Sequence, residues 1–257
     1  MPDWAGNGFR LIIYCCIVSF LGCVSISENR PSSSEKIAKV NMQLGANYLQ
    51  QGKLEFALEK LKKSIEYNPK LTSAHSVIAI VYNRLGQDEL ADKHYQQSIN
   101  LIADDTAEYG VVHNNYGVFL CNHARYTEAE AHILRAVNNH LYKTPEVGYE
   151  NVGVCAMRQG QVEKAEGYFR QALQINSKMP RALLNMAEIK YTTKRYLQAR
   201  AYMQRYHDIV AGSSASLWLG IRIEKELGDL SIVSKLGRDL ITKFPDSDET
   251  QLFLGLN

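Results

Sequence analysis

The sequence predicts an all-α fold, a right-handed superhelical solenoid of about six helix–turn–helix repeats. Three observations support this prediction. A small residue is followed twelve positions later by alanine five times along the chain, the units recur with a period of about 34 residues, and glycine or proline separates the expected helices. One unit of two helices cannot bury its apolar face alone, so units of this kind must stack on one another.

The small residue and the alanine are expected where the two helices of a unit cross. Antiparallel helices approach closely only if small side chains face each other there, and aromatic side chains then fill the space beside the crossing. A period near 34 with this pattern resembles the tetratricopeptide repeat (TPR). The five pairs are Gly45–Ala57, Ala79–Ala91, Gly117–Ala129, Gly153–Ala165 and Ala187–Ala199.

Local signals place the units in order. Asp104 or Asp105 is a possible cap for the helix that follows an insertion at 103–107. Pro145 suits a first helical turn, and Tyr142 and Tyr149, around the spacer before the fourth unit, are expected to be exposed. The expected segments are 36–66, 72–101, a third unit after the insertion, a fourth from 145, 180–209, a degenerate sixth at 213–245, and a short capping helix at the end.

The first 23 residues differ in kind from the rest. Residues 11–21 are apolar apart from Ser19, a run too short to span a bilayer comfortably. Gly22 and Cys23 then resemble a bacterial lipobox, with Phe20 in place of the usual leucine. We predict a lipoprotein signal peptide over 1–22 and lipidation of Cys23. An ordinary secretory signal and an uncleaved anchor are the alternatives.

The rest of the domain organisation follows from this start. Residues 23–35 are polar and serine-rich and are predicted to be a lipidated tether, and residues 36–257 are predicted to form the solenoid. Val24 stands where an aspartate would favour retention in the inner membrane. We therefore expect the protein on the periplasmic face of the outer membrane.

Composition and motifs argue against several functions. With 46% hydrophobic and 22% charged residues and a net charge of +2, the chain lacks the excess of basic residues that is typical of nucleic-acid-binding proteins. No nucleophile elbow, phosphate loop or zinc-ribbon motif occurs, and no histidine pair has the HExxH spacing. We predict that the protein is not an enzyme and has no cofactor, metal or small-molecule substrate.

Three asparagines and two arginines are candidates for a peptide-binding groove. Asn115, Asn151 and Asn185 each lie two residues before a small anchor residue, on the first helix of a unit, which lines the inside of such a solenoid. An asparagine offers a donor and an acceptor, which suits an extended peptide backbone. Arg158 and Arg181 are expected on the same surface. The alternative is that the asparagines only bridge neighbouring helices.

Two cysteines remain outside the N-terminal segment, Cys121 and Cys155. They lie near the ends of the first helices of adjacent units, which pack side by side. In an oxidising compartment they can form a disulfide if their Cα atoms lie within about 7 Å. The alternative is two small buried core residues.

Specific segments resemble a known family. The stretches NNYGVFLC (Asn114–Cys121), ENVGVCA (Glu150–Ala156) and LGIRIEKELGD (Leu219–Asp229) resemble the type IV pilus biogenesis and stability TPR lipoproteins, the PilF/PilW-type pilotins. The resemblance covers essentially the mature chain. It departs from the family at Phe20 in the lipobox and at Ala124, where relatives often carry glycine.

The resemblance implies a function. Pilotins sit on the inner leaflet of the outer membrane and promote localisation or multimerisation of the pilus secretin, so the implied partner is a secretin subunit. Many members carry a cysteine pair at the positions of Cys121 and Cys155, which implies a disulfide. Two alternatives remain, another lipid-anchored periplasmic TPR scaffold that recruits cell-envelope enzymes and a cytoplasmic repeat adaptor.

Overall fold

The structure is a computed structural model that describes residues 32–255, and this part of the chain contains 13 helices and no strand. The predicted solenoid of six helix pairs with a terminal capping helix is confirmed. The predicted signal peptide, Cys23 and the first part of the predicted tether lie outside the described residues. The pairs are α1 (Ser33–Gln50) with α2 (Leu54–Tyr67), α3 (Thr72–Arg84) with α4 (Asp88–Leu101), α5 (Ala107–Asn122) with α6 (Tyr126–Asn138), α7 (Pro145–Arg158) with α8 (Val162–Ile175), α9 (Pro180–Thr192) with α10 (Tyr196–His207), and α11 (Ser214–Leu227) with α12 (Leu230–Lys243), followed by α13 (Asp248–Gly255).

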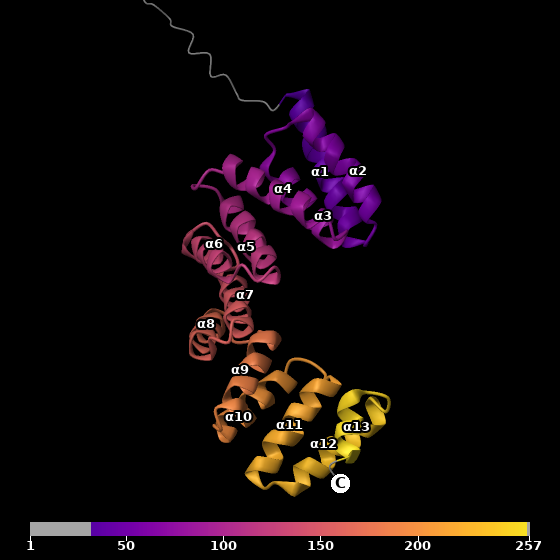
Figure 1. The fold of residues 1–257 in the computed structure, drawn as a ribbon, viewed down its shortest axis with the longest axis vertical. Helices are drawn as coiled ribbons and strands as arrows, with labels where there is room; N and C mark the ends of the chain where they lie inside the picture. Colours follow the sequence, from indigo (N-terminus) through magenta and orange to yellow (C-terminus); the bar gives the residue numbers. More distant parts are fainter. Residues whose placement is uncertain (1–31, 256–257) are drawn as a thin grey trace, which may run out of the picture.

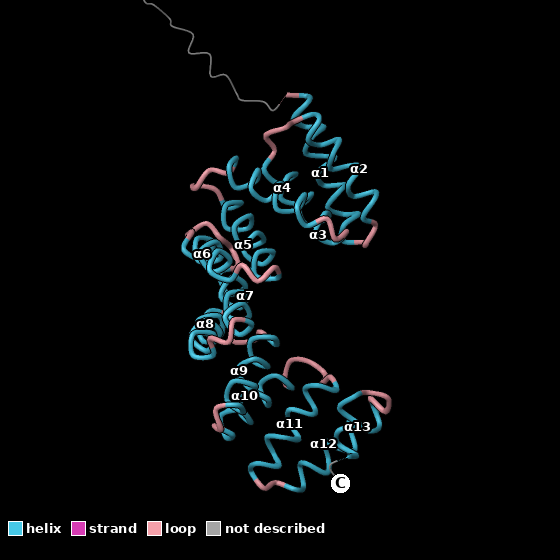
Figure 2. The backbone as a smooth tube through the Cα atoms, viewed as in Figure 1, coloured by secondary structure: helices cyan, strands magenta, loops and turns pink. Residues whose placement is uncertain are grey.

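The pairs follow a C-shaped arc in which α1–α4 and α11–α13 form the two ends (Figure 1). Short loops join the helices throughout (Figure 2). The first helix of each pair packs against the first helix of the next, whereas no two second helices have Cα atoms within 8 Å of each other. The odd-numbered helices therefore form the inner, concave layer and the even-numbered helices form the outer layer.

The small anchor residues admit a large side chain from the partner helix. A Cβ atom on Gly117 would lie 2.4 Å from Cγ1 of Ile133 and 2.9 Å from the carbonyl oxygen of Ala129. The sixth pair keeps this contact at Gly220, although Ile232 replaces the expected alanine there, which explains why its sequence pattern is weak. The same spacing between glycine and large side chain recurs in Gly45–Leu61, Gly153–Phe169 and Gly220–Leu236.

Each turn inside a pair contains one residue in the left-handed region. Glycine, which has no Cβ, adopts it without strain. Two turns have other residues, Ala124 with φ of 56° and Lys194 with φ of 59°. The four glycines are Gly52, Gly86, Gly160 and Gly228.

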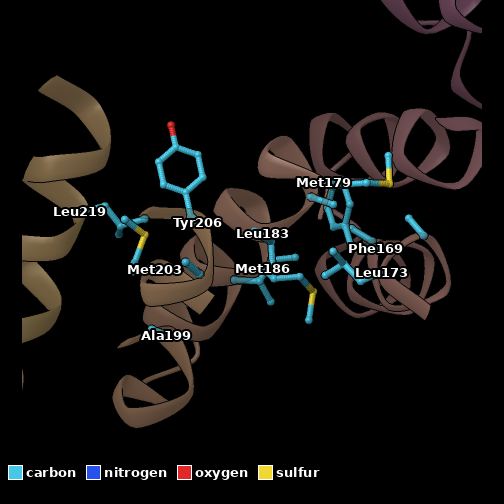
Figure 3. Packing of buried hydrophobic residues seen from close by; sticks show 14 of the residues in the cluster. Phe169, Leu173, Met179, Leu183, Met186, Ala199, Met203, Tyr206 and Leu219 are labelled. Carbon is cyan, nitrogen blue, oxygen red and sulfur yellow. The ribbon is translucent and has the colours of Figure 1, made fainter. Parts of the chain in front are cut away.

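Neighbouring repeats share one core. Figure 3 shows Phe169 of α8, Leu183 and Met186 of α9, and Met203 of α10 in one buried cluster, which Leu219 of α11 joins from the sixth pair. Phe169, Leu183 and Met186 are completely buried. Because each interface buries side chains from two repeats, the arc behaves as a stack and not as separate helical hairpins.

The solenoid begins slightly earlier than predicted. Helix α1 starts at Ser33, within the expected tether of residues 23–35. The hydroxyl of Ser32 accepts a hydrogen bond from the backbone N–H of Glu35 at 3.1 Å. The serine-rich stretch therefore ends in a helix cap, a role that its composition also allows.

The cap of α5 also differs from the prediction. Thr106, and not Asp104 or Asp105, caps the helix by accepting from the N–H of Tyr109 at 3.3 Å. Its own hydroxyl donates to the carbonyl oxygen of Ala103 at 2.8 Å. A threonine can make both bonds at once, whereas an ionised aspartate only accepts.

The spacer before the fourth pair is part of the core. Tyr142 is only 7% exposed, so its predicted exposure is wrong. Its ring fills the space above Gly110, where a Cβ would lie 2.6 Å from it, and it reaches Gly148. Tyr149 is half-buried and packs against the buried cluster that contains Phe169.

Candidate functional site

A groove of about 340 Å³ lies on the inner face, where α5, α7 and α9 meet. Three of the five residues predicted for a peptide groove line it, namely Asn151, Arg158 and Arg181. All of the lining side chains come from inner helices, as expected for the concave side of such a solenoid. The complete lining is Val118, Cys121, Asn122, Asn151, Val154, Arg158 and Arg181.

Asn151 connects three inner helices. Its amide Nδ2 donates to Oδ1 of Asn114 on α5 at 3.0 Å, and its Oδ1 accepts from Nη2 of Arg181 on α9 at 3.2 Å. Arg181 Nε also lies 3.7 Å from Oε2 of the buried Glu150. Burial raises the pKa of Glu150, while the charge of Arg181 opposes that rise. Asn151 thus bridges neighbouring helices, which was the alternative to peptide binding, and it also lines the groove.

Arg158 is the second arginine that lines the groove. Its Nη1 donates to Oδ1 of Asn122 at 2.5 Å, and both Arg158 and Arg181 are exposed. No carboxylate is among the lining side chains. Two guanidinium groups beside asparagine amides can bind a carboxylate and the backbone of an extended peptide.

The remaining two predicted residues are not in the groove lining. Asn185 donates from Nδ2 to the carbonyl oxygen of Arg181, four residues earlier in its own helix, at 2.7 Å. Asn115 is half-buried outside the groove. The prediction missed Asn122, although it lies five residues after the anchor Gly117, just as Arg158 follows Gly153. That equivalence was the available signal.

Cys121 and Cys155 meet beneath the groove. The structure joins them in a disulfide between α5 and α7, with a Cα–Cα distance of 5.7 Å that suits such a bond. Both side chains are buried, at 6% and 2% exposure. The bond ties the inner helices of the third and fourth repeats together, and these helices contribute most of the groove.

Two histidine pairs recur at equivalent positions of the second and third repeats. The Nδ1 atoms lie 3.1 Å apart in His75–His94 and 2.9 Å apart in His113–His132. Burial, together with the partner histidine, lowers the pKa of His94 and of His113 to about 4. A contact between two Nδ1 atoms needs one donor and one acceptor, so it is lost when both rings of a pair are protonated.

These four histidines lack the HExxH spacing, so the sequence predicted no role for them. The signal that this prediction missed is the identical spacing within the two pairs, which occupy matching places in successive repeats. The described residues hold no group of three or more side chains that could bind a metal ion. Within that same part of the chain, no helix combines the length and apolarity needed to cross a bilayer.

Comparison with known proteins identifies relatives of the whole chain. Tetratricopeptide repeat family models match residues 120–180 and 156–216. The type IV pilus assembly protein PilF of Pseudomonas aeruginosa is 31% identical over 246 residues, which cover 94% of this chain and 96% of that protein. The solved structure of P. aeruginosa PilF superposes with a TM-score of 0.79 at 30% identity, covering 88% of this chain and all of that one. PilW, a widely conserved type IV pilus biogenesis factor, superposes with a TM-score of 0.77 at 28% identity, covering 85% and 99% of the two chains.

Proposed function

Because the chain belongs to the PilF family of type IV pilus biogenesis proteins built from tetratricopeptide repeats, we propose that it is a pilotin of the outer membrane. In this proposal it is a lipoprotein that binds the secretin subunit of the pilus and promotes its localisation and multimerisation. The work is done by binding alone, so the protein needs no cofactor.

The N-terminal sequence supports the anchor. The apolar run that ends in Gly22–Cys23 provides a lipidation site, and Val24 favours the outer membrane. Acyl chains contribute about 0.8 kcal/mol of membrane affinity per buried CH₂ group, and more than one chain holds a protein stably. A tethered solenoid raises the local concentration of any subunit it binds, which promotes multimerisation without further chemistry.

The observation that carries the binding proposal is the inner groove with its two exposed arginines. An extended secretin segment would lie along α5, α7 and α9, with a carboxylate near Arg158 or Arg181. The amide of Asn151 would exchange its bonds within the protein for bonds to the peptide backbone. The disulfide beneath the groove limits how far α5 and α7 can separate, which reduces the entropy lost on binding.

The test is secretin multimerisation in fractionated envelopes. A deletion should abolish multimers or leave them in the inner membrane, and Cys23→Ala should mislocalise them. The double variant Arg158→Glu/Arg181→Glu should abolish assembly while the protein itself stays in the outer membrane. The matched control, Arg135→Glu/Arg238→Glu, changes two exposed arginines of the outer helices α6 and α12 and should assemble normally.

Normal multimers in the outer membrane of the deletion strain would refute the pilotin proposal and favour a general envelope scaffold. If only the groove variant assembled normally, the anchor would matter while the secretin would bind elsewhere on the solenoid. Equal defects in the groove and control variants would mean that net charge, and not the groove, determines assembly.

A further inference from the structure

A second cleft opens on the outer side of the arc, between α8 and α10. No Cα atoms of these two helices lie within 8 Å of each other, and the space between them holds a cavity of about 460 Å³ with the end of α9 as its floor. We propose that this outer cleft binds an acidic peptide segment of a partner protein, at a site separate from the inner groove. Its charged lining residues are Glu166, Arg170, Lys190, Arg195 and Arg205.

The junction between the third and fourth repeats shows how the space between two outer helices can be closed. Between α6 and α8, the hydroxyl of Tyr168 donates to Glu130 at 2.5 Å and Nζ of Lys164 donates to the same carboxylate at 2.6 Å. The cavity that Glu130 lines at this junction measures about 10 Å³. A balanced set of polar groups therefore seals that junction, so an open cleft is not a necessary result of the repeat geometry.

At the outer cleft, the equivalent positions carry different charges. Gln198 stands where the fourth repeat has Lys164, the lysine that closes the previous junction. Arg195 and Arg205 stand where the fourth repeat has Gln161 and Gln171. The fifth repeat has thus lost a bridging cation and gained two cations that line an open cleft.

The cleft holds its cations in place. Nζ of Lys190, which is 4% exposed, lies 2.7 Å from Oε1 of Glu166, and Nη2 of Arg170 lies 2.5 Å from the same oxygen. The guanidinium of Arg205 sits 5.5 Å from the centre of the Tyr202 ring. Groups that are already oriented lose little entropy when a ligand binds.

The charge of the cleft calls for an anionic ligand. Four cations face one carboxylate, an excess of +3 in a chain whose total net charge is +2. Among the described residues, no hydrogen bond or ion pair engages the side chain of Arg195. Guanidinium groups pair with carboxylates through two parallel hydrogen bonds, so aspartate or glutamate side chains are the fitting ligands.

The size of the cleft favours a peptide over a single ion or a lipid surface. A volume of about 460 Å³ lies in the range of pockets that enclose a sizeable ligand and far exceeds one phosphate. Lys190 is the most buried of the four cations, at 4% exposure. A flat membrane surface would reach protruding cations, whereas an extended chain can enter the cleft.

Fluorescence anisotropy with a labelled octapeptide of alternating glutamate and glycine tests the proposal, using full-length protein in a non-ionic detergent. The variant Arg195→Gln/Arg205→Gln restores the residues of the preceding repeat and so should fold normally, which circular dichroism checks. It should weaken binding by about tenfold or more. The control Arg135→Gln/Arg238→Gln removes the same charge from other outer helices and should bind as the wild type does, and the glutamine–glycine peptide should not bind.

Several results would overturn the proposal. Unchanged binding by the cleft variant would show that the peptide binds elsewhere on the protein. An equal loss in the control would show that net charge alone attracts the peptide. Displacement by inorganic phosphate at equal concentration would identify a phosphate site instead. Phosphatidylglycerol vesicles that bind through Arg195 and Arg205, without peptide binding, would identify a membrane contact. Secretin assembly measured in the same variant separates the outer cleft from the inner groove.

Discussion

Replacing Gly117 by alanine should destabilise the third repeat, although alanine is the better helix former. The substitution gains about 1 kcal/mol of helix propensity. The new Cβ would lie 2.4 Å from Cγ1 of Ile133 and 2.9 Å from the carbonyl oxygen of Ala129. Overpacking of this kind costs about 1–3 kcal/mol. We expect a net loss of up to about 2 kcal/mol of unfolding free energy.

A double-mutant cycle isolates the contact. Ile133 is completely buried, so Ile133→Ala alone should cost about 2–5 kcal/mol. With that side chain shortened, the contact with Cγ1 of Ile133 disappears while the 2.9 Å contact with the carbonyl oxygen of Ala129 remains. The gain in helix propensity should then offset the remaining strain, so that Gly117→Ala becomes nearly neutral. The coupling energy between the two sites should therefore be up to about 2 kcal/mol, in the direction of mutual compensation.

Urea unfolding followed by far-ultraviolet circular dichroism measures both effects, provided that the denaturant slope stays constant across the variants. Gly167→Ala in α8 is the matched control, because a Cβ there would meet nothing within 4 Å. It should stabilise the protein by about 0.5–1 kcal/mol. If Gly117→Ala stabilised the protein as much as this control does, or if the cycle were additive, the close crossing would not be what requires glycine.

Three further predictions concern stability. Burial holds the pKa of His94 and His113 at about 4, so the unfolded chain binds more protons than the folded chain between pH 6.5 and pH 4. Acidification across this range should therefore lower the unfolding free energy by about 2–3 kcal/mol for each of these two histidines. A thermal unfolding temperature that did not change across this range would contradict the prediction. Replacing Cys121 and Cys155 together by serine should cost at least about 3–4 kcal/mol without reductant and clearly less relative to the reduced wild type. Free thiols at these positions in unfolded, unreduced protein would disprove the disulfide. Phe169→Ala empties a completely buried position and should cost about 3–5 kcal/mol; a loss below about 1 kcal/mol in urea unfolding would show that the shared core does not hold repeats four and five together.

Much of the fold was predictable because its signals are local. Pro145 and Pro180 start helices where the sequence places them, since proline suits a first helical turn. The choice of Thr106 over two nearby aspartates was not predictable, because any of the three residues can cap a helix. The burial of Tyr142 was missed because it depends on Gly110, a residue in a different element, leaving room for the ring.

The sequence by itself determined the number of repeats and the close crossings, because a regular repeat period places the small residues of each unit at equivalent points. Only the tertiary structure decided which side chains meet across repeats. The bridge from Arg181 to Asn151, the His113–His132 contact and the opening of the outer cleft depend on how the helices are rotated against one another. That rotation arises from the packing of many side chains at each interface, so no single segment of the sequence specifies it.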